Sequence, residues 1–183
     1  FRFVGINFGS EEGEANNGLV RLGTGRETAS DEFPHHIILD RCLVGGDSIA
    51  GGKRGVLLAG DYLGVVRSYI SNWKLEGIDS QAVAGWTGRG PWRVEDCYLE
   101  AAAEAFLSGG SDPTIFDLVP SDIQITGNLF SKPLAWNPFS PAYDGSTWQC
   151  KNALELKNAR RVLINGNRFQ HNWFAQQSGS MIL

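Results

Sequence analysis

Hydrophobic and polar residues alternate along several short stretches of this chain, which is the pattern of β-strands that bury one face. In VLINGNRFQHNW (162–173) the alternation reaches Ile164, a small polar residue follows at Asn167, and an apolar one stands at Phe169. The same spacing occurs upstream in IILDRCLV, GVVRSYI, WRVEDCYL and IQITGNLF, with Cys42, Ser68, Cys97 and Asn128 at the small position. A sixth stretch, FVGINF, places Ile6 there instead.

The six motifs lie at unequal distances along the chain. Their first apolar residues are 36, 26, 29, 31 and 39 residues apart, at Phe3, Leu39, Val65, Val94, Ile125 and Ile164. A constant motif with variable spacing is typical of a solenoid whose strands stack while its turns differ in length. The sequence therefore predicts that the small residues line up in one corner of successive coils.

A second strand precedes each motif after the first. These strands are GLVRL (18–22), RGVLLAG (54–60), QAVAGW (81–86), EAFLSG (104–109) and NALELKN (152–158), with SMIL (180–183) as a possible sixth. Two strand types would thus alternate, each stacking on its counterpart about 4.8 Å away. The segment Leu99 to Leu107 is rich in helix formers. We expect a turn and a strand there, because the flanking motifs require the chain to come round, and a short helix is the alternative.

The rungs LINGNRF, ITGNLF and VEDCYL resemble right-handed parallel β-helix proteins of the pectate-lyase-like superfamily, in which small polar residues stack inside a turn. Longer stretches are similar to a group of uncharacterised bacterial β-helix proteins. The resemblance implies an all-β, right-handed, single-stranded parallel β-helix of about six coils, with residues 1–183 as one domain. Because the chain begins at Phe1 and ends on SMIL, we expect it to be a fragment of a longer solenoid.

Composition and charge exclude several classes of function. The 183 residues are 42% hydrophobic and 20% charged, with a net charge of −4. The basic residues form no stripe of the kind that nucleic acids require. No apolar run approaches the ~20 residues of a membrane-spanning helix, and the chain contains no signal peptide. We nevertheless expect a secreted or periplasmic protein.

The cysteine and histidine positions argue against a disulfide or a zinc site. Cys42 and Cys97 occupy the same motif position two coils apart, or ~9–10 Å, which is beyond the reach of a disulfide. We therefore expect both to be buried ladder residues. His35 and His36 are adjacent and point to opposite faces of a strand. No metal or cofactor is predicted, although calcium bound by scattered carboxylates is left open.

Aromatic residues suggest where a sugar could bind. The long loop Ser131 to Lys151 contains Trp136 and Trp148, whose flat rings suit the C–H face of a pyranose. The alternative is that these rings hold the loop against the solenoid. Arg89 lies between Trp86 and Trp92 in the sequence and could clamp a carboxylate or stack on a ring. A solvated loop arginine is the alternative for that residue.

Two carboxylates are candidates for chemistry. If Ala105, Leu107, Leu154 and Leu156 point inward, Glu104 and Glu155 face outward as diagonal neighbours ~7–8 Å apart. Glycoside hydrolysis uses carboxylates at such separations. Lys157 could lower a carboxylate pKa or, in a lyase, abstract a proton next to a uronate. Taken singly, Glu155 and Lys157 could be a solvated ion pair and Glu104 a turn residue.

The resulting hypothesis is a carbohydrate-active β-helix that cleaves a polysaccharide, as a glycoside hydrolase or polysaccharide lyase, beneath the Ser131 to Lys151 loop. Its candidate catalytic residues are Glu104, Glu155 and Lys157, and its candidate substrate-binding residues are Trp86, Arg89, Trp136 and Trp148. The alternative is a non-catalytic glycan-binding, surface or assembly module. Self-association through exposed β-helix ends is a further expectation, because unpaired strand edges invite stacking.

Overall fold

The computed structural model describes residues 1–175 and 179–183, and its strands form three parallel sheets. Sheet A contains β1 (Arg2–Val4), β4 (His35–Asp40), β7 (Asp61–Val66), β10 (Trp92–Glu95), β13 (Ser121–Thr126) and β16 (Arg160–Asn165). Sheet B contains β2 (Asn7–Gly9), β5 (Leu43–Gly45), β8 (Tyr69–Trp73), β11 (Tyr98–Ala101), β14 (Leu129–Ser131) and β17 (Arg168–Gln170). Sheet C contains β3 (Asn16–Leu22), β6 (Gly52–Ala59), β9 (Gln81–Thr87), β12 (Glu104–Ser108) and β15 (Leu154–Leu156). Two single-turn 3₁₀ helices, Ser30–Glu32 and Leu134–Trp136, lie in the connections.

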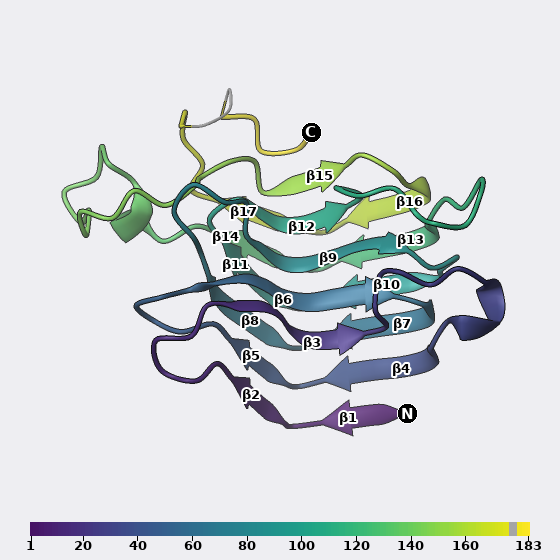
Figure 1. The fold of residues 1–183 in the computed structure, drawn as a ribbon. Helices are drawn as coiled ribbons and strands as arrows, with labels where there is room; N and C mark the ends of the chain where they lie inside the picture. Colours follow the sequence, from purple (N-terminus) through teal and green to yellow (C-terminus); the bar gives the residue numbers. More distant parts are fainter. Residues whose placement is uncertain (176–178) are drawn as a thin grey trace.

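Successive coils run through sheets A, B and C in that order and lie one above the next (Figure 1). This is a right-handed parallel β-helix of about six coils, as the sequence predicts. The number of strand types differs from the prediction. Each motif contains the end of a sheet A strand and the start of a sheet B strand, with the small residue in the corner between them. A coil therefore has three strands, and the motif is a bent pair of strands.

The corner between sheets A and B has one conformation in all six coils. A residue with positive φ closes each sheet A strand: Gly5 (67°), Arg41 (53°), Arg67 (48°), Asp96 (52°), Gly127 (67°) and Gly166 (66°). The predicted ladder residues follow directly and bond to one another. The backbone N–H of Cys42 donates to Ser68 Oγ at 3.0 Å, and that of Cys97 donates to Asn128 Oδ1 at 2.9 Å. The predicted alignment of these residues is confirmed.

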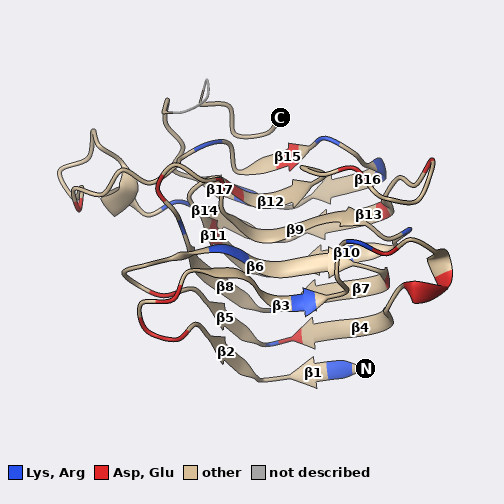
Figure 2. Ribbon diagram, in the orientation of Figure 1, with Lys and Arg blue, Asp and Glu red and all other residues tan. Residues whose placement is uncertain are grey.

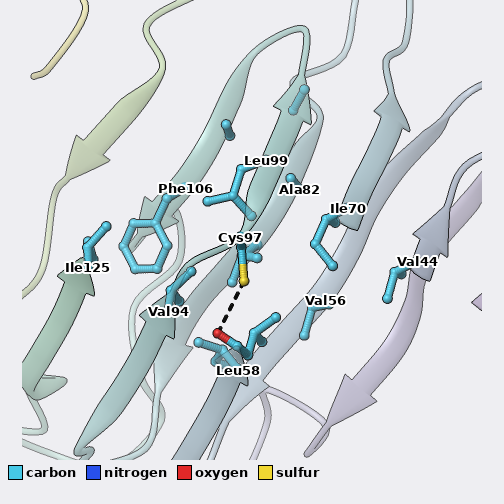
Figure 3. Close-up of a cluster of buried hydrophobic side chains, with 14 of the residues drawn as sticks. Val44, Val56, Leu58, Ile70, Ala82, Val94, Cys97, Leu99, Phe106 and Ile125 are labelled. Carbon is cyan, nitrogen blue, oxygen red and sulfur yellow. Dashed lines mark hydrogen bonds between the residues drawn. The ribbon is translucent and has the colours of Figure 1, made fainter. Parts of the chain in front are cut away.

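The core consists of files of similar side chains, one from each coil. Each file has four residues with 0% exposure: Leu39, Val65, Val94 and Ile125 in sheet A; Val44, Ile70, Leu99 and Phe130 in sheet B; Val56, Val83, Phe106 and Leu154 in sheet C. Figure 3 shows Cys97 among these files, and its thiol donates to the carbonyl of Val65 at 3.4 Å. Because β-branched and aromatic residues fit pleated, half-buried surfaces, the pattern that predicts strands also fills the interior.

The segment Leu99 to Leu107 forms the end of β11 and most of β12, so the predicted turn and strand are confirmed. The alternation of faces breaks at the start of β12, where the N–H groups of Ala105 and Phe106 both donate to the carbonyl of Ala153, at 2.8 and 3.1 Å. Ala105 is a core residue although its neighbour Phe106 is one too. Phe106 enters the core, and Leu107 lines the outer surface instead of pointing inward as expected.

The connection from β14 to β15 extends away from the coils (Figure 1, green). It is fixed to the segment 74–80 of an earlier coil, since the N–H of Gln149 donates to the carbonyl of Leu75 at 2.9 Å and Thr147 Oγ1 donates to Glu76 at 3.0 Å. Within the described residues there is no helix with the length and hydrophobicity that crossing a bilayer requires.

Candidate functional site

The outer face of sheet C is hollowed into a groove of about 570 Å³, which we term the sheet C groove. Strands β6, β9 and β12 and the segment 77–79 supply its walls, and its lining includes Lys53, Arg54, Asp79, Gln81, Trp86, Leu107 and Lys157. The start of β6, which carries Lys53 and Arg54, is blue in Figure 2. The lining therefore holds three cations and one carboxylate, so it favours anionic ligands.

A chain of hydrogen bonds crosses the coils along one side of the groove. Arg54 Nε donates to Gln81 Oε1 at 3.2 Å, and Gln81 Nε2 donates to Glu104 Oε2 at 2.9 Å. Lys151 completes it, because its Nζ lies 2.9 Å from Glu104 Oε1 and 2.7 Å from Asp79 Oδ2. Side chains held at both ends keep one rotamer, so the groove presents its polar groups in a fixed arrangement.

Glu104 is 0% exposed. Burial raises its pKa, and the hydrogen bonds from Gln81 and Lys151 oppose that effect. Burial also works to lower the pKa of Lys151, but its hydrogen bonds to Asp79 and Glu104 outweigh it and raise that pKa. Lys151 therefore remains an ammonium group that joins two carboxylates. Glu104 lies beneath the groove and does not line it.

Glu155 faces outward as expected, but it is not a diagonal neighbour of Glu104. The register aligns Leu107 with Glu155 and Phe106 with Leu154. Glu104 is thus three residues from the partner of Glu155, or ~10 Å along the strand. Glu155 is 3% exposed, and its Oε1 lies 3.1 Å from Lys157 Nζ. The expected spacing of these carboxylates is wrong, because the register sets Phe106 opposite Leu154 and thereby leaves Glu104 before the start of β15.

Trp86 and Lys157 are the two predicted site residues that line the sheet C groove. The Trp86 indole N–H donates to the carbonyl of Gly25 at 2.9 Å, and the Arg54 guanidinium lies 4.9 Å from the centre of the ring. The ring is therefore fixed from both sides. The Lys157 side chain is 47% exposed, which leaves its ammonium group free to meet a ligand while it is paired with Glu155.

Arg89 lies elsewhere, at the connection from sheet C to sheet A. Its Nε donates to Asp61 Oδ2 at 2.7 Å, and its backbone N–H donates to Asp61 Oδ1 at 2.8 Å. The guanidinium also lies 5.9 Å from the centre of the Phe33 ring. Trp92 is a core residue, not a neighbour in a binding loop. Arg89 is therefore engaged by this chain's own carboxylate.

Trp136 and Trp148 also lie outside the sheet C groove. They flank Lys74, whose Nζ lies 5.4 Å and 4.8 Å from the centres of their rings. Lys74 Nζ also donates to the carbonyl of Ser48 at 2.8 Å. These rings border a separate pocket of about 360 Å³ with residues 173–175. The alternative interpretation, in which the rings hold the loop against the solenoid, agrees with these contacts.

Cysteines and metal ligands add no chemistry to this site. Cys42, Cys97 and Cys150 are all buried free thiols. Burial raises the pKa of Cys97 to about 12 and that of Cys150 to about 11, which keeps both protonated and unreactive at neutral pH. Within residues 1–175 and 179–183, no group of three or more His, Cys, Asp or Glu side chains has the arrangement of a metal site.

Asp79, Arg54 and Lys151 belong to the site but were not among the predicted site residues. In the sequence Asp79 has the pattern of a turn cap, and Lys151 stands at the end of a long loop. Both come together with Glu104 only because two loops from different coils meet at the edge of sheet C. The sequence pattern gives no signal for Arg54 and Gln81, because strict alternation would place them on the same face as the core residues Val56 and Val83.

The fold is a parallel β-helix, and the outer face of its sheet C carries a groove lined by three cations and one tryptophan. Comparison with known proteins adds no identity, since no protein family, curated protein or solved structure matches the chain.

Proposed function

We propose that this protein is a pectate-lyase-like β-helix that binds an acidic polysaccharide in the sheet C groove without cleaving it. The observation that carries the proposal is the groove lining, in which Lys53, Arg54 and Lys157 face one carboxylate, Asp79, beside the fixed ring of Trp86. Uronate-bearing sugars combine a carboxylate with an apolar C–H face, so they match cations placed next to an aromatic ring.

The state of the carboxylates favours binding over hydrolysis. A glycosidase needs two carboxyl groups that reach the scissile bond from opposite sides. Glu104 and Glu155 are 0% and 3% exposed, and each is engaged by a lysine, at 2.9 and 3.1 Å respectively. Asp79 is the carboxylate at the groove surface, and Lys151 binds it at 2.7 Å. Elimination by Lys157 stays a prediction that the product assay below decides.

The stacked polar residues of the A–B corner support the superfamily assignment. Asn128 and Asn167 sit at equivalent positions of neighbouring coils, and their side chains are joined at 3.0 Å. A secreted or periplasmic location belongs to the same proposal, because acidic polysaccharides are found mainly outside the cytoplasm.

The proposal is tested by binding measurements on a matched panel of acidic and neutral polysaccharides, such as polygalacturonate, alginate and dextran. We expect saturable binding to the acidic chains, at least about tenfold weaker binding after Lys157→Gln or Trp86→Ala, and weaker binding at high salt. Arg93→Gln, on the outer face of sheet A, is the control and should bind like the wild type. Equal affinity for dextran and polygalacturonate would refute the proposal.

Cleavage is measured in the same samples from reducing ends and from the absorbance of unsaturated uronates. Binding without either product is the expected result. If products form, the variants separate elimination from hydrolysis. Elimination that uses Lys157 would stop in Lys157→Gln. Hydrolysis by Glu104 or Glu155 would be reduced in Glu104→Gln or Glu155→Gln. Products in the wild type would show that the binding-only part of the proposal is wrong.

Self-association is a second proposal, supported by the first coil. Apolar side chains are exposed in and just before strand β1, with Phe1 88%, Phe3 41% and Val4 47% exposed. Light scattering on the 183-residue chain should show association that increases with concentration, and Phe3→Ser should weaken it. A mass that stays monomeric at high concentration would contradict this proposal.

A further inference from the structure

Three arginines converge on one carboxylate at the corner between sheets A and B. Arg2 Nη2 and Arg67 Nη2 lie 2.7 and 2.8 Å from opposite oxygens of Asp40, and Arg41 Nη2 lies 3.3 Å away. Each guanidinium meets the carboxylate through its Nε and Nη2 groups. Asp40 is completely buried, whereas the side chains of Arg2, Arg41 and Arg67 are 52%, 62% and 50% exposed. This is the Arg2–Arg41–Arg67 cluster.

The cluster has more charge and more donors than Asp40 can satisfy. Three guanidinium groups and one carboxylate leave two positive charges in excess. A carboxylate offers about four lone-pair sites, and each guanidinium carries five N–H donors. Because Nε and Nη2 form one edge of the guanidinium plane, the Nη1 group of each arginine lies on the side away from Asp40. Since the three side chains are at least half exposed, an anion has access to the cluster from solvent.

Two of these arginines stand in a backbone conformation that favours glycine. Arg41 and Arg67 have φ values of 53° and 48°, and the equivalent corner residues of three other coils are Gly5, Gly127 and Gly166. The hydrogen bond of the corner is the same in each case: the N–H of Arg41 donates to the carbonyl of Val66, as that of Gly127 donates to Asn165. Non-glycine residues in this region are strained, and such strain concentrates at functional sites. The backbone geometry of the corner does not require arginine there.

The cluster adjoins a hollow on the outer face of sheet A. The hollow is about 500 Å³. Arg2 and Arg67 line it and Arg41 does not, and its other charged lining residues include the paired Arg93 and Glu95. Gly64 lies between Ile38 and Arg93 in the sheet register, so the absence of a side chain there deepens the middle of the face. A ligand that places an anionic group against Arg2 and Arg67 therefore has room for the group that bears it.

We propose that the Arg2–Arg41–Arg67 cluster binds a tetrahedral dianion, the phosphate or sulfate group of a small ligand. A dianion matches the two excess charges, and its oxygens accept charge-assisted hydrogen bonds from guanidinium groups. The site is formed by sheet A and its corner with sheet B, so it shares no residue with the sheet C groove. The inference is therefore independent of polysaccharide binding.

The test is an NMR titration of the ¹⁵N-labelled chain with sodium sulfate and with sodium phosphate, at an ionic strength held constant with sodium chloride. We expect saturable shifts of the Arg41 and Arg67 signals with both anions. Running each titration at about pH 6 and about pH 8 separates the two sources, since phosphate gains its second charge as the pH rises and sulfate is a dianion throughout. The phosphate affinity should rise between these pH values if dianions are recognised.

Arg41→Gly and Arg67→Gly are the informative variants, because glycine fits the corner conformation and the fold should persist. Each should weaken sulfate binding at least about tenfold. The matched control is Arg161→Gly, since Arg161 also has positive φ (55°) but pairs with a single carboxylate, Asp122, at 2.7 Å. Lys157→Gln, which tests the sheet C groove, should leave sulfate binding unchanged. Shifts that stay linear, or equal losses in Arg41→Gly and Arg161→Gly, would overturn the proposal.

Discussion

Asn167 Oδ1 accepts two hydrogen bonds from Asn128 in the preceding coil, one from the backbone N–H at 2.9 Å and one from the side-chain amide at 3.0 Å. Asn128 in turn uses its Oδ1 to accept the backbone N–H of Cys97 at 2.9 Å. The bonds run along the axis of the solenoid, between residues 31 and 39 positions apart in the sequence. The corner between sheets A and B is thus joined from coil to coil by side chains as well as by strand pairing.

Replacing Asn128 should therefore destabilise the fold. Asn128→Ala leaves the N–H of Cys97 and the carbonyl of Val94 without their partners, and we expect a loss of about 2–4 kcal/mol in the free energy of unfolding. Urea denaturation measures it. Asn165→Ala, at an exposed position two residues before Asn167, is the control and should stay within about 0.5 kcal/mol of the wild type. Equal stability of the two variants would contradict the ladder interpretation.

Asp40 should make the protein sensitive to acid. Burial works to raise the pKa of Asp40, but hydrogen bonds from Arg67, Arg41 and Arg2 outweigh it and lower the pKa to about 2. A carboxylate whose pKa is lower in the folded state contributes stability at pH values above its unfolded pKa, and this contribution is lost as the pH falls. Asp40→Asn should thus be less stable than the wild type at neutral pH, and the two should converge toward about pH 2. Urea unfolding at a series of pH values tests this, and parallel curves would count against it.

Lys132 should also make stability rise with pH, but in the alkaline range. Its ammonium group is buried and donates to the carbonyls of Ala101, Ala103 and Asn152 at 3.2, 2.8 and 3.3 Å. Burial lowers its pKa from 10.5 to about 8. Between these values the unfolded chain holds a proton that the folded chain has released, so this group makes stability rise with pH.

Lys132→Met removes that titration. The difference in free energy of unfolding between wild type and Lys132→Met should shift in favour of the wild type as the pH rises from about 8 toward 10.5. Urea unfolding of both proteins at neutral and alkaline pH provides the measurement. A difference that does not change with pH would show that Lys132 keeps its ordinary pKa despite its burial.

Two tryptophans distinguish the groove from the long loop. Trp86→Ala should weaken binding of acidic polysaccharide, whereas Trp148→Ala should leave the affinity unchanged, because Trp148 packs on Lys74 outside the sheet C groove. Trp148→Ala should instead make the Ser131 to Lys151 loop more open to limited proteolysis, since the loop loses a cation–π contact. If Trp148→Ala weakens binding as much as Trp86→Ala does, the loop takes part in the site after all.

Most of the fold could be predicted from the sequence, because a motif that recurs several times along the chain indicates that its copies stack on one another. Cys42, Ser68, Cys97, Asn128 and Asn167 stand at matching positions in five stretches, and the structure places all five in one corner. Variable spacing did not obscure this order, since the turns differ in length while the strands stay in register. The number of strands in a coil was underestimated because the step of three residues inside each motif, as from Ile125 to Asn128, was interpreted as part of one strand instead of as a corner between two strands.

The candidate site was predicted less well, for a physical reason. Ala105 and Phe106 are successive residues that both pack in the core, so Leu107 faces outward, and the register places Glu104 away from Glu155. The sequence pattern does not indicate where such a break in alternation falls. The path of a long loop is equally hidden, because Trp136 and Trp148 are positioned by contacts with Lys74 of a different coil. Trp86 and Lys157 line one groove because each lies within or next to a strand of sheet C, and their role in binding stays a prediction.

The uniform corner between sheets A and B also has a practical consequence. Since Gly5, Gly127 and Gly166 hold the same geometry whatever the length of the chain between them, the solenoid can accept extra residues elsewhere without losing its stacking. The tip of the β14–β15 connection, around 141–145, projects away from the coils (Figure 1). A reporter peptide or a small domain grafted at that tip should be displayed on the solenoid without a change in the stacking of its coils.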